Sequence, residues 1–379
     1  MKVEKRRWAS KEGWRPYSLD SIGDSAQLVL MFGSGSAIKR PEPAERLKSL
    51  YPAAHIIGCS TSGQILGARV FSDSITATAV QFERTHISLA QVRINEVHDS
   101  HEAGGALASA FEHEKLAHVL VFSDGLRVNG SELVRGMWET LPYGVAVTGG
   151  LASDGLRFND NVVCLDGEAE EGKIIAVGLY GENIKTAFSS RCGWYPFGID
   201  RVVTRSSGNE LLELDGKPAY DLYAEYLGEL ADEMPATASL LPLNLRIETE
   251  GLDLVRAAVA VNKDRRSLTF AGGMPEGATA RLMRGSAERI LKGAADAARG
   301  LQKSAGGKPA ELALIVSGTG RKVALGQRVE EEVEAARDEL GDKTALAGFY
   351  SYGEISPVSP HAPYEMKNNT ITITTFLES

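Results

Sequence analysis

One pattern, an apolar strand that runs into two glycines five residues apart, occurs three times in this sequence and constrains its fold more than any other feature. The copies are Gly58-Cys-Ser-Thr-Ser-Gly63, Gly150-Leu-Ala-Ser-Asp-Gly155 and Gly348-Phe-Tyr-Ser-Tyr-Gly353. Glycine permits tight turns and close backbone approach, and the 40 glycines of the chain punctuate strand ends rather than forming linkers. The pattern therefore predicts repeated units whose strands end in sharply turning loops.

The order of strands and helices around these loops repeats as well. Helical spacing of apolar residues alternates with short strand-like runs over residues 86–154, and residues 279–354 show the same order. We expect an α/β fold of two related lobes of mixed sheets with helices, pseudo-duplicated as strand-helix-strand-helix-strand units, with a further copy around residues 27–63. The alternative, that any α/β protein alternates strand and helix without a duplication, stays open. Helices are predicted over residues 45–50, 103–114, 131–140, 220–231, 287–304 and 328–340.

Strands are predicted where short apolar or β-branched runs are bounded by Gly, Ser or Asp. Two of them, residues 161–165 and 174–180, are joined by a glycine-containing turn and are expected to pair as a hairpin. The others are residues 27–33, 55–57, 75–82, 87–94, 118–123, 145–149, 280–284, 312–317, 345–350 and 370–376.

The charge balance and the cysteines exclude several classes of protein. With 41 Lys and Arg against 50 Asp and Glu the formal net charge is −9, whereas nucleic-acid-binding proteins usually carry a basic stripe. No apolar run approaches the ~18 residues that span a bilayer, and the basic N-terminus lacks the apolar segment of a signal peptide. Three widely spaced cysteines without a Cys-x-x-Cys motif exclude a disulfide framework and a thiolate-rich zinc site. We expect a cytoplasmic protein that neither binds nucleic acid nor inserts into a membrane.

The glycine loops do not have the residues of a nucleotide site. A phosphate-binding loop needs Lys followed by Ser or Thr directly after its second glycine, but Gln64, Leu156 and Glu354 stand there. The loops instead offer hydroxyls, carboxylates and aromatic rings at the carboxyl ends of strands, where open α/β sheets bind small molecules. This mixture favours a small zwitterion as ligand; the alternative is that the glycines only make turns and the hydroxyls cap them.

Catalytic and metal-binding signatures are weak. The sequence has no His-Glu-x-x-His motif and no Gly-x-Ser-x-Gly elbow. His98 and His101 have a metal-like spacing, but the carboxylates beside them favour a solvated surface. Cys59 is more typical of a buried small hydrophobe than of a nucleophile. We expect a protein that is not an enzyme and holds no metal, with a hydrolase using Cys59 or Ser60 as the minor alternative.

Seven segments that run in order along the chain resemble the FIST family, named for F-box and intracellular signal transduction proteins. They are IIGCSTSGQI (56–65), LVFSDGL (120–126), VTGGLASDG (147–155), CGWYPFG (192–198), ELDGKPAYDLY (213–223), GGMPEGATARLM (272–283) and LAGFYSYGEI (346–355). The resemblance implies a FIST N domain over residues 24–215 and a FIST C domain over residues 216–379. It also implies a sensory role in prokaryotic signal transduction, with amino acids as the favoured ligands. The partner would be a separate signalling protein such as a histidine kinase, a diguanylate cyclase or a chemotaxis transducer.

The sequence departs from the family pattern in two places. Ser317 stands where the family often has a cysteine, and Lys367 stands where the family pattern has a histidine. Some members resembling this chain bind haem and sense nitric oxide, and Lys367 weakens that alternative. No cofactor is therefore expected, and a haem sensor, with His55, His86, His118 or His361 as axial ligand, remains the second hypothesis.

The ligand is expected near residues 348–354 and 368–370. Arg321 would pair with a ligand carboxylate, and Glu354 or Asp154 would meet an ammonium group. The predicted ligand-binding residues are Cys59, Ser60, Thr61, Gly149, Gly150, Asp154, Ser317, Arg321, Gly348, Tyr350, Tyr352, Gly353, Glu354, Lys367, Asn368 and Asn369.

Overall fold

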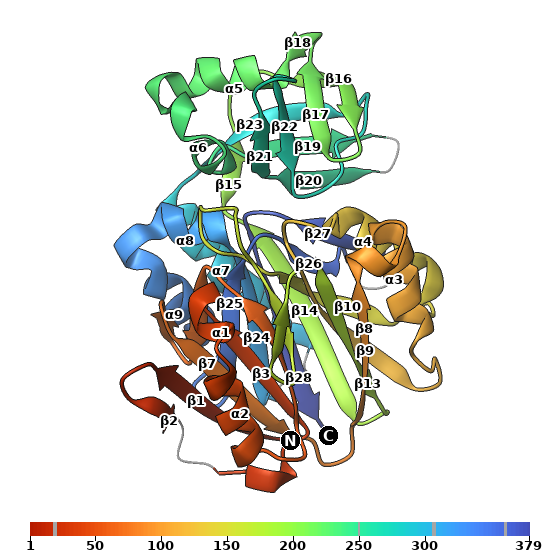
Figure 1. Cartoon of the computed structure of the whole chain (residues 1–379), viewed down its shortest axis with the longest axis vertical. Helices are drawn as coiled ribbons and strands as arrows, with labels where there is room; N and C mark the ends of the chain where they lie inside the picture. The colour runs from red at the N-terminus through yellow and green to blue at the C-terminus, as the bar shows by residue number, and fades with distance from the viewer. Residues whose placement is uncertain (18–20, 249–250, 305–307, 360–361) are drawn as a thin grey trace.

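The computed structural model describes residues 1–17, 21–248, 251–304, 308–359 and 362–379. It shows a three-sided body below and a smaller domain above it, with both chain ends at the bottom of the body (Figure 1). We call the upper part, residues 194–285, the inserted domain, because the chain enters it from β14 and returns from it into α7. Among the described residues, no helix has the length and apolar character needed to cross a bilayer.

The body consists of three repeats of one unit. In each repeat two parallel strands are joined by a helical connection, and antiparallel strands extend the sheet on one side. The first repeat contains β1 (Lys2–Ala9), β2 (Gly13–Pro16), β3 (Leu28–Gly33), α1 (Gly35–Ile38), α2 (Pro41–Leu50), β4 (His55–Ser60), β5 (Gly63–Leu66), β6 (Arg69–Phe71) and β7 (Ile75–Gln81). The second contains β8 (His86–Arg93), α3 (Ser100–Ser109), β9 (Leu116–Ser123), α4 (Gly130–Thr140), β10 (Ala146–Leu151), β11 (Val163–Leu165), β12 (Glu168–Glu170) and β13 (Lys173–Tyr180). The third contains β14 (Ile184–Cys192), α7 (Ala287–Ser304), β24 (Leu312–Gly318), α8 (Thr319–Leu325), α9 (Val329–Leu340), β25 (Ala345–Ser351), β26 (Glu354–Pro357), β27 (Tyr364–Lys367) and β28 (Thr370–Glu378).

Each repeat lends a pair of short strands to the sheet of another repeat. After β4 the chain crosses over so that β5 pairs with β25; after β10, β11 pairs with β4; after β25, β26 pairs with β10. The three sheets therefore have equivalent orders, β12-β11-β4-β3-β7-β1-β2, β27-β26-β10-β9-β13-β8 and β6-β5-β25-β24-β28-β14. The loops that follow β4, β10 and β25 are the crossover points, so the sequence pattern that repeats three times marks where the repeats interlock.

One glycine position in each repeat explains the spacing of the pattern. Gly58, Gly149 and Gly348 each stand fourth in their strand, opposite Met31, Val121 and Ile315 of the parallel partner. A Cβ at these positions would lie 1.7 to 1.9 Å from the partner's carbonyl oxygen, so only glycine fits. The equivalent of Gly58 and Gly348 is thus Gly149, one residue before the Gly150 that the sequence pattern selects.

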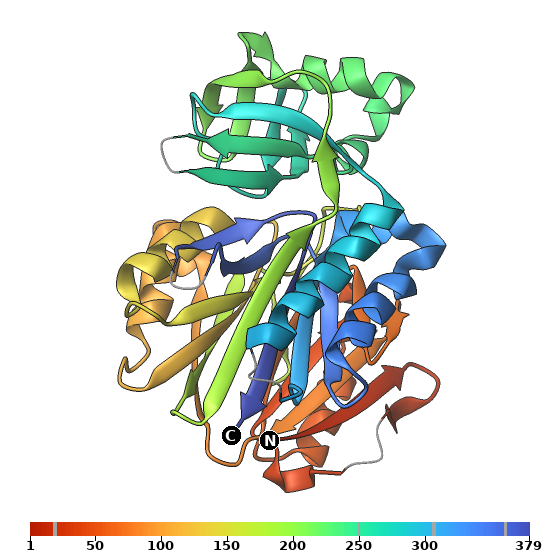
Figure 2. The same ribbon diagram turned by 180° about the vertical axis from the view of Figure 1, so that it is seen from behind.

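Hydrophobic packing fills the centre of the three-sided body and the space under its helices. The inner faces of the sheets share a core in which Phe32, Phe122 and Phe349 are neighbours, with Phe32 and Phe349 stacked at 4.5 Å between ring centroids. Separate clusters lie beneath α2, beneath α3 with α4, and beneath α7 with α9, and Figure 2 shows α7 and α9 in front of the third sheet.

The inserted domain is a curled sheet with one longer helix. Its sheet order is β20-β19-β23-β16-β17-β22-β21, and because β20 and β21 are consecutive along the chain the sheet closes back on itself around its own core. The elements are β15 (Trp194–Pro196), β16 (Arg201–Ser207), β17 (Glu210–Leu214), β18 (Lys217–Pro218), α5 (Ala219–Leu227), α6 (Ala236–Ser239), β19 (Leu243–Ile247), β20 (Leu252–Arg256), β21 (Ala258–Asn262), β22 (Ser267–Phe270) and β23 (Thr279–Gly285).

The predicted α/β class, with mixed sheets and repeated units, is confirmed. The predicted hairpin is wrong: β11 pairs with β12 and β4, whereas β13 pairs with β8 and β9 in a different sheet. The domain boundary predicted at residue 215 stays a prediction; it falls at the turn between β17 and β18, inside the inserted domain.

Candidate functional site

The three glycine loops meet at the top of the body. The Ser62 hydroxyl lies 2.9 Å from the Ser153 hydroxyl and 2.6 Å from that of Thr319, at the start of α8. Ser153 in turn donates to the carbonyl of Tyr350 at 2.7 Å. Loops from all three repeats are therefore tied to one another by side-chain hydroxyls.

Tyr352 joins the second and third loops from the other side. Its single hydroxyl hydrogen is shared between the Asp154 carboxylate and the carbonyl of Gly155 at 2.8 Å, and its oxygen accepts from the N–H of Phe158 at 3.3 Å. Asp154 accepts three backbone N–H groups from residues 158–160, which fixes the conformation of this loop. The ring of Phe158 stacks on that of Tyr352, with 4.9 Å between the centroids and 15° between the planes.

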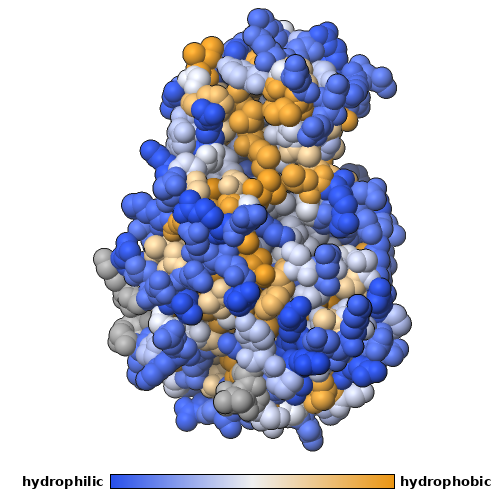
Figure 3. Space-filling model, turned by 90° about the vertical axis from the view of Figure 1, so that its left-hand side faces the viewer, coloured by the Kyte–Doolittle hydropathy of each residue, from blue (hydrophilic) through white to orange (hydrophobic). Residues whose placement is uncertain are grey.

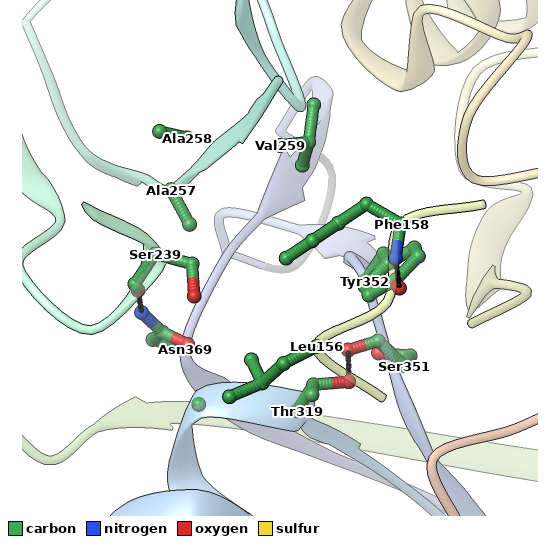
Figure 4. A pocket seen from close by; sticks show the side chains of 11 residues that line it. Leu156, Phe158, Ser239, Ala257, Ala258, Val259, Thr319, Ser351, Tyr352 and Asn369 are labelled. Carbon is green, nitrogen blue, oxygen red and sulfur yellow. Dashed lines mark hydrogen bonds between the residues drawn. The ribbon is translucent and has the colours of Figure 1, made fainter. Parts of the chain in front are cut away.

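A recess lies between these loops and the inserted domain, and Figure 4 shows its walls. Its empty volume is about 300 Å³ including space open to solvent, and the centre of a water-sized molecule can occupy about 20 Å³ of it. Figure 3 shows hydrophobic atoms gathered in the narrowing between the upper and lower parts of the molecule. The lining residues are Leu156, Phe158, Ser239, Ala257, Ala258, Val259, Thr319, Gly320, Ser351, Tyr352 and Asn369.

The turn between β27 and β28 holds the inserted domain over the recess. Asn368 accepts from the backbone N–H of Ala257 at 3.1 Å and donates to the carbonyl of Tyr352 at 2.7 Å. Asn369 donates to the carbonyl of Ser239 at 3.3 Å. Two consecutive asparagines thus connect the body to two segments of the inserted domain beside the recess, the one at Ala257 and the one at Ser239.

Glu354 lies directly beneath the floor of the recess. Its carboxylate accepts from the hydroxyl of Ser351 at 2.8 Å and from the N–H and hydroxyl of Thr370 at 2.9 and 2.7 Å. The group is fully buried, and burial raises its pKa to about 7 despite these hydrogen bonds. Half-buried Lys367, opposite Glu354 on β27, donates to Ser356, and loss of solvent lowers the pKa of its amine to about 8.

Arg321 does not line the recess. It is fully buried, and its Nε donates to Glu332 Oε1 at 2.6 Å, while one terminal nitrogen donates to the carbonyl of Ile290. The other oxygen of Glu332 accepts from the hydroxyls of Ser317 and Tyr350 at 3.1 and 2.8 Å. This arrangement makes Arg321, Ser317 and Tyr350 parts of one buried polar cluster in the core of the third repeat.

The remaining predicted residues support the loops from within. Cys59 is fully buried in the central core, and burial raises the pKa of its thiol well above the ordinary value, so it holds no reactive thiolate. Ser60 accepts from the N–H of Val162, and Thr61 donates to the carbonyl of Gly33. Gly149, Gly150, Gly348 and Gly353 lie in or beside the crossover strands, where neighbouring atoms leave no room for a side chain.

The described histidines do not line the recess. His118 is buried in the body with its Nε2 at 2.9 Å from Thr148, and burial lowers its pKa to about 3. His55 and His101 pair with surface carboxylates, and His361 lies outside the described residues. Within the described ranges, no group of three His, Cys, Asp or Glu side chains could hold a metal ion.

Of the residues predicted from sequence, Tyr352 and Asn369 line the recess, and Asp154, Glu354 and Asn368 stand immediately behind its walls. Sequence reasoning missed Ser239 and residues 257–259, because the inserted domain approaches only in the folded chain and carries no motif there. Phe158 and Thr319 could have been found, since each follows directly on a glycine loop or on the end of β24.

Family models and relatives with similar sequences both match most of the chain. A model of the FIST N domain matches residues 27–217, and a model of the FIST C domain matches residues 219–357. An uncharacterized protein of Mycobacterium tuberculosis is 24% identical over 361 residues, covering 89% of this chain and 88% of the relative. One from Mycobacterium bovis is 22% identical over 351 residues, covering 89% and 87%, and one from Methanocaldococcus jannaschii is 25% identical over 224 residues, covering 55% and 42%.

Proposed function

The chain belongs to the FIST family, whose domains suggest a signal-transduction sensor, and on this premise we propose that it senses a small metabolite, an amino acid or a similar compound, in the recess beneath the inserted domain. A separate output protein, such as a histidine kinase, a diguanylate cyclase or a chemotaxis transducer, would receive the signal. The proposal includes no catalytic step.

One observation carries this proposal. The loops of the second and third repeats and the inserted domain converge on a recess with apolar walls and a few polar groups, which is the usual character of a small-molecule site. A ligand there touches the body through Thr319 and Ser351 and the inserted domain through Ser239 and Val259. Its binding therefore changes how firmly the two parts are held together, which is what an output protein could detect.

The recess is narrow, so entry of a metabolite larger than water requires the inserted domain to move. Two chain crossings, at Gly193 and at Ser286, and the two-asparagine turn connect the domain to the body. The described residues of the recess include no histidine, so they do not fit haem ligation by an imidazole.

A thermal-shift screen with a matched pair of variants tests the proposal. A ligand at 100 times its dissociation constant adds about 2.7 kcal/mol to the free energy of unfolding and raises the melting temperature by several degrees. Ala257→Leu fills the recess from the inserted domain, whereas Ala260→Leu places the same side chain on an exposed position of β21. The expected result is a stabilising metabolite whose effect disappears in Ala257→Leu and persists in Ala260→Leu. A complete set of amino acids and related metabolites without effect on the unmodified protein would contradict it.

A further inference from the structure

The hydroxyl groups around the recess have already donated their hydrogens to the protein. Tyr352 donates to Asp154, Ser351 to Glu354, and Ser239 to the carbonyl of Ala236 at 2.7 Å. Thr319 donates to the carbonyl of Ser351 at 2.9 Å. Because a hydroxyl has one hydrogen, these four groups can offer a ligand only their oxygen lone pairs.

Asn369 adds another acceptor. Its amide nitrogen donates to the carbonyl of Ser239, which leaves its oxygen, Oδ1, without a partner among the described residues. A Cβ on Gly320 would come within 2.2 Å of this oxygen, so glycine at that position keeps the oxygen uncovered. The side chains of the recess therefore form a set of acceptors.

The charges near the recess also favour a ligand that donates hydrogen bonds and carries a positive charge. Two of the hydroxyls, those of Tyr352 and Ser351, donate to buried carboxylates, which increases the negative character of their oxygens. No described residue that lines the recess is charged. The buried cations nearby are already partnered: Arg321 is paired with Glu332, and Arg256, next to Ala257, donates to the carbonyls of Gly273 and Met366. Lys367 donates to Ser356. A carboxylate or phosphate would thus meet acceptors without a cation, whereas an ammonium would meet acceptors backed by negative charge.

The apolar walls complete the description of the ligand. The stacked rings of Phe158 and Tyr352 stand beside the acceptors, and an aromatic face attracts a cation. Leu156, Val259 and the alanines of the inserted domain provide room for a short alkyl group. The narrow recess admits a group of about the size of water, such as an ammonium.

Resting on the proposed function, we propose that the recess recognises a small primary amine without an anionic group, its ammonium donating to Ser239, Ser351 and Asn369. The proposal names the class of metabolite that the sensor selects. Such an amine is preferred over an amino acid because the carboxylate of an amino acid would have no cationic partner in the recess.

Three compounds of the same alkyl chain separate the possibilities. Isobutylamine carries the amine alone, valine carries both groups, and isovalerate carries the carboxylate alone. Calorimetry on the full chain is expected to show isobutylamine binding at least tenfold more tightly than valine, with no binding of isovalerate. Isobutylamine binding should be lost in Ala257→Leu and kept in Ala260→Leu.

A second pair of variants tests the acceptor role. Ser239→Ala removes an acceptor of the recess, whereas Thr237→Ala removes the hydroxyl that donates to Leu230 on the outer side of the same helix. The expected change is about tenfold weaker amine binding in Ser239→Ala and no change in Thr237→Ala. Equal or tighter binding of valine or isovalerate in the recess, or amine binding that survives Ala257→Leu, overturns the amine proposal and leaves the proposed function standing. Absence of binding by these compounds and by all other metabolites overturns both.

Discussion

At the scale of single residues, the third repeat buries two carboxylates in different states. Glu332 has a guanidinium partner in Arg321, while Glu354 is surrounded by hydroxyls and an amide. The first is a structural ion pair, and the second is a carboxyl group whose proton affinity is raised by burial. Each carboxylate leads to its own prediction.

Glu354 should make the protein less stable as the pH rises from about 4.5 to about 7. The pKa of Glu354 is about 7 in the folded protein and close to the ordinary 4.5 in the unfolded chain. Between these values the folded state binds more protons than the unfolded state, so raising the pH favours unfolding. The groups facing it are Ser351, Thr370, Lys367, Arg321 and Cys192. Lys367, with a pKa of about 8, contributes above this window instead.

Denaturant unfolding at pH 5 and pH 7.5 measures this effect. The loss of stability between the two values should shrink in Glu354→Gln, which keeps an acceptor for the N–H of Thr370. An equal loss in the unmodified protein and in Glu354→Gln would show that Glu354 is not the titrating group.

Arg321→Ala should lower the free energy of unfolding by about 3–5 kcal/mol, because it leaves the Glu332 carboxylate buried without its partner. The double variant Arg321→Met with Glu332→Gln removes both charges and keeps an acceptor for Tyr350 and Ser317, so it should recover much of that loss. Ligand affinity in the double variant should stay within about twofold. A large loss of affinity there would instead support the carboxylate contact that the sequence suggested for Arg321.

At the scale of elements, each crossover depends on a strand passing close to its parallel neighbour. Gly348→Ala would place a Cβ 1.9 Å from the carbonyl oxygen of Ile315 and force β24 and β25 apart. The expected cost is at least about 1–3 kcal/mol of stability, measured by chemical denaturation. Gly105→Ala, on α3 with only Thr140 Oγ1 at 3.6 Å, is the control and should be neutral or stabilising.

The sequence predicts elements better than it predicts their pairing. The helices over residues 131–140 and 287–304 are found because their apolar residues keep a helical period. The pairing of β11 with β4 is missed because a short buried strand carries no local sign of its partner, and the crossover joins residues about a hundred positions apart. Ser239 and Val259 are also missed, because they reach the recess only through contacts between segments far apart in the sequence.

At the scale of the molecule, the inserted domain is attached at two adjacent points. Trp194 and Gly285 face each other across an antiparallel pair, so their Cα atoms lie about 5 Å apart. Replacing residues 195–284 by an Asn-Gly turn should therefore leave a body that unfolds in one cooperative transition, followed by circular dichroism. Binding of the recess ligand should disappear.

Division of the chain at residue 215 should behave differently. The first fragment would lack β24, β25, β26 and β28, so β14 would lose its sheet partner, and β5 and β10 would each lose one of their neighbours. Neither fragment should give the native near-ultraviolet spectrum alone. A well-folded fragment 1–215 would show that the exchange of strands is not needed for folding.

The interlocked body offers three equivalent loop crossovers, but the inserted domain covers one position only. The symmetry of the repeats would allow three ligands to a chain and cooperativity among them. The single insertion leaves one such recess, so on the proposed function one chain should bind its ligand along a plain hyperbola.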